Sequence, residues 1–280
     1  MFLSMNDDRR FQRLFVLATL LVIPLTTAMA APQAELWPRW EAHDPASTEV
    51  IDHSDWQAFL DAYLIANHPS GVNRVPYGEV SGADRRALQG YLDDLQSVPV
   101  SELNRDEQLA YWINLYNAAT VDVILDNYPV DSIRDIGGGL VAKGPWDEAL
   151  LRVEGEDLTL NDVEHRIIRP IWRDERIHYV VNCGSIGCPD LYPEPLTASN
   201  WERVFEESAK SYTNHPRGVR FDGNRLVLSE IYNWYVADFG GDIDGVIAHL
   251  VDYVDDATAR RLQSHSGRGR YEYDWSLNEP

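Results

Sequence analysis

The chain has 280 residues, of which 44% are hydrophobic and 11% aromatic, so it can bury a sizeable core and lacks the composition of a disordered protein. Its net charge of −21 at pH 7 argues against binding nucleic acid through phosphate neutralisation. Lysine occurs only twice, and carboxylates are abundant. A surface of this kind suits a high-salt environment, although simple solubility explains the composition equally well.

The N-terminus predicts export. Three arginines precede an apolar run over residues 14–27, and the run ends in Ala28-Met29-Ala30. This pattern is typical of a secretory signal peptide over residues 1–30, with cleavage before Ala31. The run is shorter than the ~20 residues that span a bilayer, and no cysteine follows it for lipid attachment. We expect a periplasmic or secreted protein without a stable membrane anchor after cleavage; the competing interpretation is an uncleaved anchor.

The first half of the mature chain predicts helices. Residues 31–53 are polar and rich in proline, which indicates a leader segment. Hydrophobic residues then recur at helical spacing, and serine or asparagine stands at each expected helix start. The expected helices run from Ser54 to Ala66, from Ser81 or Asp84 to near Pro99, and from Asn104 to just before Pro129.

The second half predicts a mixture of strands and helices. A hairpin is expected around Gly155, and a second around Asp222-Gly223-Asn224. Helices are expected over 162–169, 200–213, 230–239 and 242–262, and a strand over 177–182. No linker divides the sequence. We therefore expect a single α+β domain over residues 54–280, with a helical N-terminal half packed on a small, mostly antiparallel sheet.

The two cysteines of the chain, Cys183 and Cys188, lie in a glycine-rich loop directly after the expected strand. Four interpretations remain open for them: a disulfide, a metal site, a nucleophile or buried apolar filler. An export compartment favours the disulfide. The nucleophile would be Cys188, because Gly187 gives access to it and Pro189 fixes the outgoing chain. The pair also suits redox chemistry, although its spacing is wider than that of common dithiol motifs, and zinc is the weaker alternative.

A nucleophilic thiol needs a base, and His165 is the leading candidate. Asn161 lies one helical turn before it and could orient its ring. Glu164 is its neighbour, but adjacent helical residues point about 100° apart, which argues against direct orientation by Glu164. His178 shares a face of the expected strand with Asn182. Both histidines also fit a structural role in the core.

Other polar residues are out of place in their surroundings. Asn114 and Asn117 lie within an apolar helix, where asparagine is unfavourable, so they either line a polar pocket or hold a neighbouring loop. Asp274 lies in an aromatic segment and either caps backbone donors or orients a histidine. Four arginines between residues 166 and 176 either bind a substrate carboxylate or pair with nearby acids. The candidate binding residues are Asn114, Asn117, Glu164, His178, Cys183 and Asp274.

Five motifs in order resemble a known family. They include Cys183-Gly184-x-x-Gly187-Cys188-Pro189 and cover residues 109–118, 160–169, 177–189, 228–239 and 273–278. Together they resemble the domain of unknown function 547 family over roughly residues 100–278. Gly187 departs from the pattern, which more often has serine before Cys-Pro. The resemblance implies no agreed activity.

Two functions from different classes fit these residues. The first is a thiol-dependent hydrolase or transferase acting on an acyl or amide bond, with Cys188 as nucleophile, His165 as base and Asn161 as its support. The second is a non-catalytic periplasmic binding or scaffold module with a Cys183–Cys188 disulfide. In either case we expect a small-molecule or peptide ligand, a cleft near residues 165 and 183–189, no cofactor and no metal.

Overall fold

The computed structural model describes residues 31–137 and 144–280. The predicted signal peptide, residues 1–30, lies outside the described residues and stays a prediction. From residue 31 onward the chain forms one compact unit that includes the predicted leader segment. Within the described part of the chain, no helix is both long and apolar enough to cross a bilayer.

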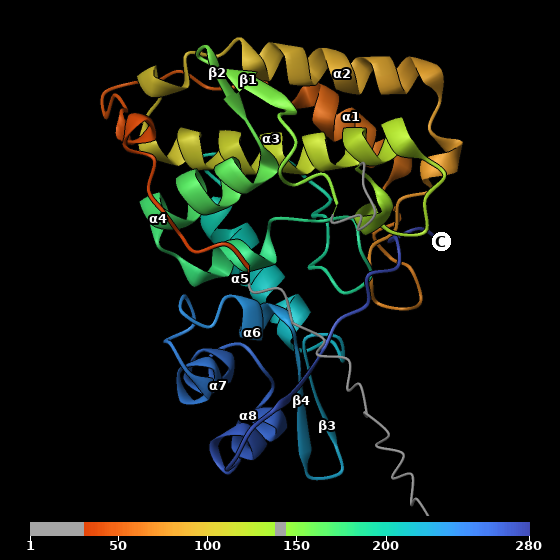
Figure 1. Cartoon of the computed structure of the whole chain (residues 1–280), viewed down its shortest axis with the longest axis vertical. Helices are drawn as coiled ribbons and strands as arrows, with labels where there is room; N and C mark the ends of the chain where they lie inside the picture. The colour runs from red at the N-terminus through yellow and green to blue at the C-terminus, as the bar shows by residue number, and fades with distance from the viewer. Residues whose placement is uncertain (1–30, 138–143) are drawn as a thin grey trace, which may run out of the picture. The chain divides into compact units, whose positions relative to one another are not determined.

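Three helices build the first half, as predicted, and α2 and α3 run side by side in Figure 1. Their bounds are Ser54–Tyr63 for α1, Gly82–Gln96 for α2 and Arg105–Asn127 for α3. The side chains of Ser81 and Asn104 accept hydrogen bonds from the first turns of α2 and α3, as their sequences predict. The cap predicted for α1 is wrong: Ser54 is the first helical residue, and the Asp52 carboxylate accepts from its backbone N–H.

Helix α3 is the centre of the larger hydrophobic core. Its residues are buried almost without interruption from Glu107 to Val121, so this helix has no solvent-facing stripe over that stretch. Short 3-10 helices connect the surrounding segments, at Pro38–Glu41, Tyr77–Glu79, Val100–Glu102 and Ile133–Asp135. Polar side chains on a helix buried in this way must find hydrogen-bond partners inside the protein.

The strands form two small sheets, and the predicted α+β class is confirmed. The hairpin around Gly155 pairs β1 (Leu151–Val153) with β2 (Glu156–Leu158) in antiparallel register. The second predicted hairpin pairs β3 (Val219–Asp222) with β4 (Arg225–Ser229). A further strand near the C-terminus, β5 (Arg270–Glu272), adds to β4 in parallel.

The helices of the second half are a π-helix at Asp162–Ile168 continued by α4 (Arg169–Trp172), α5 (Trp201–Thr213), α6 (Ile231–Trp234), α7 (Ile243–Val251) and α8 (Asp256–Gln263). Those predicted over 162–169 and 200–213 are found near their predicted bounds, whereas the one predicted over 230–239 is shorter. The helix predicted over 242–262 is two helices, because the Asp255 side chain caps a new start by accepting from Ala257 and Thr258.

The strand predicted over residues 177–182 is wrong. The chain forms a 3-10 helix at Glu175–Tyr179, which the Asp174 side chain caps by accepting from Arg176 N–H, and then continues without regular structure. An apolar run indicates burial, and here the burial is between two cores: Ile177 packs into the larger core and Tyr179 into the smaller. His178 therefore has no strand face to share with Asn182.

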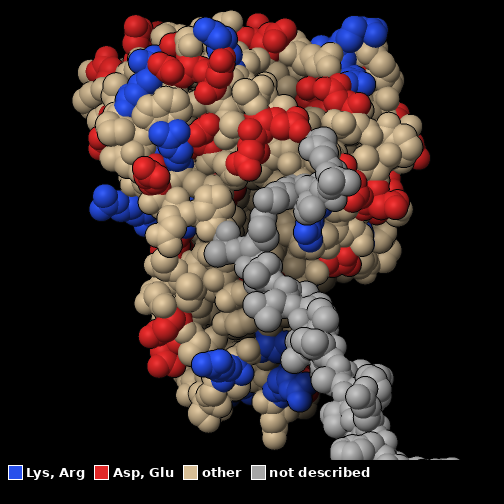
Figure 2. Space-filling model, viewed as in Figure 1, with Lys and Arg blue, Asp and Glu red and all other residues tan. Residues whose placement is uncertain are grey.

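The acidic composition appears on the surface. Figure 2 shows carboxylates gathered over the part that carries α2 and α3, with arginines between them. Asp93 and Asp94 of α2 are two of the exposed carboxylates. Exposed ion pairs such as Arg152–Asp157 contribute at most about 1 kcal/mol each, so this surface adds little to stability.

A buried histidine near the start of α1 makes stability depend on pH. His53 is 6% exposed and hydrogen-bonds the Tyr91 hydroxyl through Nδ1. Burial lowers the pKa of His53 to about 4, whereas the unfolded chain protonates near 6.5. The neutral form is therefore favoured by folding, and its contribution is present above pH ~6.5 and is lost as pH falls toward 4. The loss amounts to about 3 kcal/mol.

We expect urea unfolding to show this loss between neutral pH and the folded pKa of His53. The variant His53→Gln should have a flatter dependence of the unfolding free energy on pH over that window. His43→Gln, at an exposed histidine, controls for the loss of one imidazole. Equal pH dependence in His53→Gln and the parent protein would contradict a buried neutral His53.

Candidate functional site

The cysteine loop is held by the last residues of the chain. Ile186 N–H donates to Ser276 O and Gly187 N–H to Asp274 O, each at 2.8 Å, while Asn278 N–H donates to Gly184 O at 2.9 Å. A Cβ at position 187 would lie 2.8 Å from the Asp274 backbone nitrogen, so this contact requires glycine there. Two motifs that are far apart in sequence thus form one structural unit.

Helix α3 supports the same loop from the other side through its asparagines. Asn117 Nδ2 donates to Val180 O at 2.9 Å, and its Oδ1 accepts from Asn182 N–H at 2.8 Å. Asn114 makes the same pair of bonds with the backbone N–H and C=O of Leu196. Both asparagines therefore hold neighbouring chain segments, which is one of the two roles predicted for them.

The two thiols are in contact inside this braced loop. Both cysteines are free, with their Sγ atoms 2.8 Å apart. Cys183 Sγ also lies 3.2 Å from Ser185 Oγ and 3.1 Å from Tyr273 Oη. The Cys183 backbone N–H donates to Cys188 Sγ at 2.9 Å. Cys188 is 4% exposed, whereas Cys183 is only half-buried.

These contacts drive the two thiol pKa values apart. Burial by itself would raise the pKa of Cys183, but hydrogen bonds from Cys188, Ser185 and Tyr273 outweigh it and hold that pKa below its ordinary value. Burial, and then donation to Cys183, raise the pKa of Cys188 well above its ordinary value. Two neighbouring titratable groups whose pKa values are shifted in opposite directions are typical of catalytic sites in which one group reacts ionised and the other protonated. The lowered pKa favours Cys183 over Cys188 as the thiolate, whereas the sequence pattern favours Cys188 as the nucleophile.

His165 lies in a separate cluster on the π-helix. Arg169 Nη1 donates to His165 Nδ1 at 2.9 Å, and the Glu164 carboxylate lies 3.7 Å from the same nitrogen. Because 3.7 Å is longer than a hydrogen bond and Arg169 already occupies Nδ1, no direct orientation of His165 by Glu164 is seen, in line with the prediction. Asn161 donates to Asp147 at 2.7 Å, so the role predicted for Asn161 in orienting His165 is not seen. Burial, the largest influence, lowers the pKa of His165 and favours the neutral ring.

Asp238 joins this cluster to the second buried histidine. Its Oδ2 accepts from Arg169 Nε at 2.7 Å and lies 2.7 Å from His178 Nε2, while the His178 ring stacks on Tyr235 at 3.9 Å. Burial opposes ionisation of Asp238, but the hydrogen bonds from His178 and Arg169 outweigh it and hold its pKa well below the usual range. Glu164, His165, Arg169, His178 and Asp238 thus form one buried charge cluster.

Arginines of the segment 166–176 form ion pairs with nearby carboxylates, which is one of the two roles predicted for them. Arg166 pairs with Asp162, and Arg176 pairs with Asp174. Asp274 accepts from Ser276 N–H at 2.9 Å, so it caps backbone and no histidine contact is seen for it in the described chain. Among the residues that the structure describes, no group of three or more His, Cys, Asp or Glu side chains is arranged to hold a metal ion.

The thiol pair and the charge cluster are neighbours without direct contact. In residues 31–137 and 144–280, no hydrogen bond or ion pair joins His165 to either sulfur. The Tyr116 hydroxyl is close to both groups. It donates to Glu164 at 3.1 Å, and its pKa is raised by burial, by Glu164 and by the nearby thiols. The dyad of Cys188 and His165 predicted from the sequence is therefore not formed in this structure.

Three contributing residues were not singled out from the sequence: Ser185, Asp238 and Tyr273. All three lie inside the five motifs. The roles of Asp238 and Tyr273 depend on contacts across 60 and 90 positions of sequence, with His178 and Cys183 respectively. A tyrosine beside Asp274 offers no local signal that separates a thiol partner from a core aromatic.

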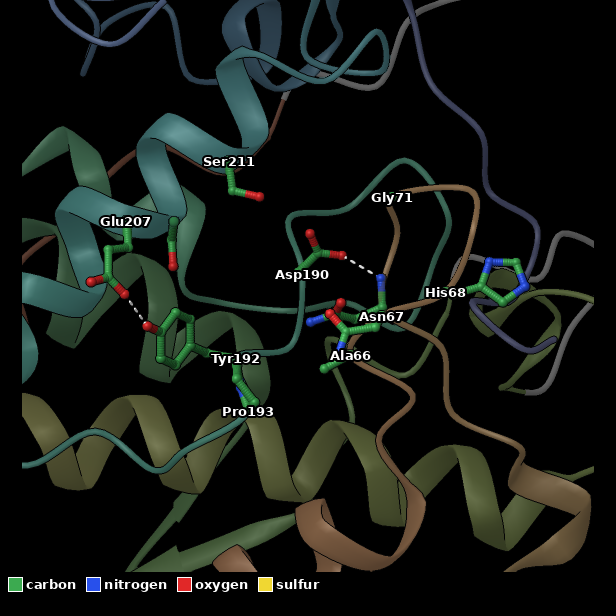
Figure 3. A pocket seen from close by; sticks show the side chains of 11 residues that line it. Ala66, Asn67, His68, Gly71, Asp190, Tyr192, Pro193, Glu207 and Ser211 are labelled. Atoms are coloured by element: carbon green, nitrogen blue, oxygen red, sulfur yellow. Dashed lines mark hydrogen bonds between the residues drawn. The ribbon is translucent and has the colours of Figure 1, made fainter.

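A cavity of about 660 Å³ lies beside the outgoing end of the cysteine loop. Figure 3 shows it between the loop around Asn67, the segment from Asp190 to Pro193, and Glu207 and Ser211 of α5. The cysteines themselves are not among its lining residues. This cavity is not the cleft predicted near residues 165 and 183–189, because its lining contains none of those residues and reaches the loop only at Asp190, two residues beyond Cys188.

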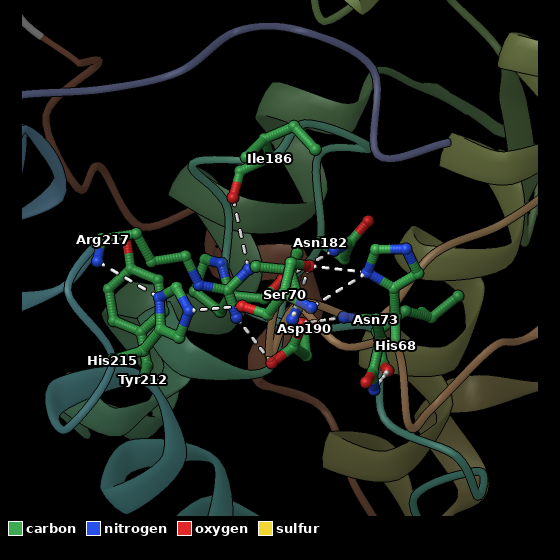
Figure 4. Close-up of polar contacts among 12 residues, drawn as sticks. His68, Ser70, Asn73, Asn182, Ile186, Asp190, Tyr212, His215 and Arg217 are labelled. Atoms are coloured by element: carbon green, nitrogen blue, oxygen red, sulfur yellow. Dashed lines mark hydrogen bonds and ion pairs between the residues drawn. The ribbon is translucent and has the colours of Figure 1, made fainter. Parts of the chain in front are cut away.

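Asp190 connects this cavity to the loop through a polar network, drawn in Figure 4. It accepts from Asn73 N–H at 2.8 Å and from Arg217 Nη2 at 2.5 Å. Arg217 Nη1 also donates to Ile186 O within the cysteine loop, at 3.2 Å. The cavity wall and the thiol loop are therefore mechanically linked.

Comparisons with known proteins agree with the motifs. Residues 100–213 match the family model described as "Protein of unknown function, DUF547". No curated protein and no solved structure matches this chain. The matched segment contains α3, the π-helix, the cysteine loop and α5. Over residues 100–213, the resemblance of this chain to the domain of unknown function 547 family is confirmed.

Proposed function

We propose that this protein is a thiol-dependent hydrolase or transferase acting on an acyl or amide bond, with Cys183 as its nucleophile. One observation carries the proposal: three groups that can donate a hydrogen bond to a thiolate, Cys188 Sγ, Ser185 Oγ and Tyr273 Oη, lie within 3.2 Å of Cys183 Sγ. Such donors favour the thiolate, which is the nucleophilic form of cysteine. Cys183 is also the less buried of the two cysteines, which favours it over Cys188 for the first contact with a substrate.

The reaction follows from this geometry. The Cys183 thiolate attacks the carbonyl carbon and forms an S–C bond, and the bond to the leaving amine or alcohol breaks as that group takes a proton from water. Water, or an acceptor amine, then attacks the thioester, loses a proton to solvent and releases Cys183 as thiolate. Ser185 Oγ donates to Tyr273 Oη at 3.1 Å, so the Tyr273 hydroxyl is the donor for the oxyanion and Ser185 supports it. The Ile186 and Gly187 N–H groups are already bonded to the closing segment.

The second candidate is a binding or scaffold module with a Cys183–Cys188 disulfide. The contact between the two sulfurs favours it, because they need only a small approach to bond. The export compartment predicted from the N-terminus also favours oxidation. The linked cavity at Asp190 would then serve as the ligand site of the module.

Alkylation kinetics test the nucleophile. We expect Cys183 to react with iodoacetamide at neutral pH faster than an ordinary thiol, and Tyr273→Phe to slow it about tenfold for each pKa unit regained. Tyr271→Phe is the matched control, because Tyr271 lies in β5 two residues earlier and the described structure shows no bond from it to either sulfur. An unchanged rate in Tyr273→Phe would show that the phenol does not stabilise the thiolate.

Ester turnover tests the function itself. With p-nitrophenyl acetate as probe, we expect a covalent acyl adduct on Cys183 by intact mass and loss of turnover in Cys183→Ser. Cys188→Ser keeps a hydroxyl in place of the thiol beside Cys183 Sγ, so turnover should be reduced but not lost. If neither thiol of the purified protein reacts until a reductant is added, and reduction restores no turnover, the scaffold module is favoured instead.

A further inference from the structure

We propose that Cys183 and Cys188 form a reversible dithiol–disulfide couple that exchanges with small-molecule disulfides such as oxidised glutathione, with Cys183 attacking first and Cys188 resolving. This activity shares the Cys183 nucleophile with the proposed hydrolysis but does not depend on it. It adds a substrate class, the low-molecular-weight disulfide, and gives Cys188 a covalent role, whereas in acyl transfer Cys188 contributes only a hydrogen bond to Cys183.

The first support is that the two sulfurs are held together by the fold. The loop is fixed by Asn117 on one side and by the closing segment 274–278 on the other. Asn182 adds an internal brace by donating to Pro189 O at 2.7 Å and accepting from Gly184 N–H. The Sγ–Sγ distance of 2.8 Å is therefore a property of a braced loop, and a bond between the sulfurs requires little backbone movement.

The second support is the division of exposure between the thiols. An incoming disulfide must reach the attacking sulfur, and Cys183 is half-buried while Cys188 is 4% exposed. The resolving sulfur needs no access to solvent, because its target is Cys183 Sγ. Exposure and thiolate stability thus select the same residue, Cys183, for the first step.

The third support is that the first step prepares the second. Apart from burial, the pKa of Cys188 is raised by its hydrogen bond to Cys183 Sγ and by the charge of the Cys183 thiolate. Both influences disappear once Cys183 is part of a mixed disulfide. The bond from Cys183 N–H to Cys188 Sγ favours the Cys188 thiolate and remains in place. Cys188 therefore becomes easier to ionise at the moment when it has to attack.

The groups around the sulfurs are neutral phenols. Burial, and then the thiols, raise the pKa of Tyr77 and of Tyr273 above the ordinary phenol value, so both stay protonated. Tyr116 is protonated as well, because burial is the largest of the influences that raise its pKa. Tyr77 donates its O–H to Asn278 Oδ1 and Tyr116 donates to Glu164, so Tyr273, 3.1 Å from Cys183 Sγ, is the phenol placed to donate to the thiolate without supplying a competing charge.

The electron balance is that of thiol–disulfide exchange. The Cys183 thiolate attacks one sulfur of glutathione disulfide, a Cys183–glutathione bond forms, and one glutathione leaves as thiolate. Cys188 then gives its proton to solvent and attacks Cys183 Sγ, and the second glutathione leaves. The two protein thiols are oxidised to one disulfide, and one glutathione disulfide is reduced to two glutathiones. The reverse reaction regenerates the dithiol and the Cys183 nucleophile.

The experiment follows the purified, reduced protein after addition of oxidised glutathione, with acid quenching and intact mass. We expect the parent protein to pass to the internal disulfide with little mixed disulfide. Cys188→Ser should accumulate one stable glutathione adduct, mapped to Cys183. Cys183→Ser should form an adduct roughly a hundredfold more slowly, because the remaining thiol is buried and poorly ionised. Circular dichroism confirms that each variant is folded.

Two outcomes would overturn the proposal: absence of an adduct in folded Cys188→Ser, or a mixed disulfide that persists in the parent protein. The variant Tyr271→Phe controls for a substitution near the site that leaves the sulfurs untouched. Ester turnover in the same samples separates this proposal from the proposed function. If Cys188→Ser forms the glutathione adduct but does not hydrolyse the ester, the proposed hydrolysis is rejected and the exchange stands. If it hydrolyses the ester but forms no adduct, the exchange is rejected and the hydrolysis stands.

Discussion

Arg169→Met is expected to lower the free energy of unfolding by about 3 kcal/mol, the lower end of the cost of breaking a buried pair, because Arg169 is buried while the Asp238 side chain is 24% exposed. Arg169 is 6% exposed and serves three acceptors: Asp238, His165 and Pro32 O. The methionine fills similar volume but leaves the Asp238 carboxylate with His178 alone. The cost is therefore electrostatic, and the packing loss is small.

Arg166→Met is the matched control three residues earlier. Its side chain is 40% exposed and pairs with Asp162, so its loss should cost about 1 kcal/mol or less. Urea unfolding at neutral pH compares the two variants. Equal costs would show that the Arg169–Asp238 pair contributes no more than a surface pair.

The same pair gives a pH signature. The pKa of Asp238 is depressed in the folded protein, so its contribution is present above the unfolded pKa of about 3.9 and is lost as pH falls through the acidic range. Arg169→Met removes one cause of that depression. We expect the stability difference between the parent protein and the variant to shrink as pH is lowered from neutral into that range, and a constant difference would contradict the assignment.

Local chemistry explains which elements the sequence predicts. Helices α2 and α3 begin at Ser81 and Asn104, whose side chains satisfy the first backbone donors, and both hairpins turn at glycine-containing segments. Such signals lie within a few residues of the element they define. The strand predicted over 177–182 failed because an apolar run reports burial, and the partners that satisfy its backbone are on α3 and are remote in sequence.

The site was predictable only in part, for the same reason. Composition and spacing identified Cys183, Cys188 and His165 as residues of interest. Which thiol is the better nucleophile depends on Tyr273, ninety positions away, and on the burial of Cys188. The π-helix that carries His165 likewise has no simple marker in the sequence.

Asn117→Ala is expected to lower the free energy of unfolding by about 4 kcal/mol and also to disturb the thiol site. The substitution leaves the buried Val180 C=O and Asn182 N–H without partners, at about 1–3 kcal/mol each. Because Asn182 braces the loop that carries both sulfurs, the loss should loosen their arrangement. We therefore expect slower alkylation of Cys183 at neutral pH, since the donors to its sulfur are no longer aligned.

Asn114→Ala separates these two effects. Asn114 makes the same two bonds from the same helix, but to Leu196, eight residues beyond Cys188. Its loss should cost a similar free energy of unfolding while leaving the Cys183 alkylation rate near that of the parent protein. Urea unfolding measures the loss of stability in both variants, and iodoacetamide kinetics measure the reactivity of Cys183 in both. If both variants slow alkylation equally, general destabilisation explains the effect; if only Asn117→Ala does, α3 positions the reactive thiol through that one side chain.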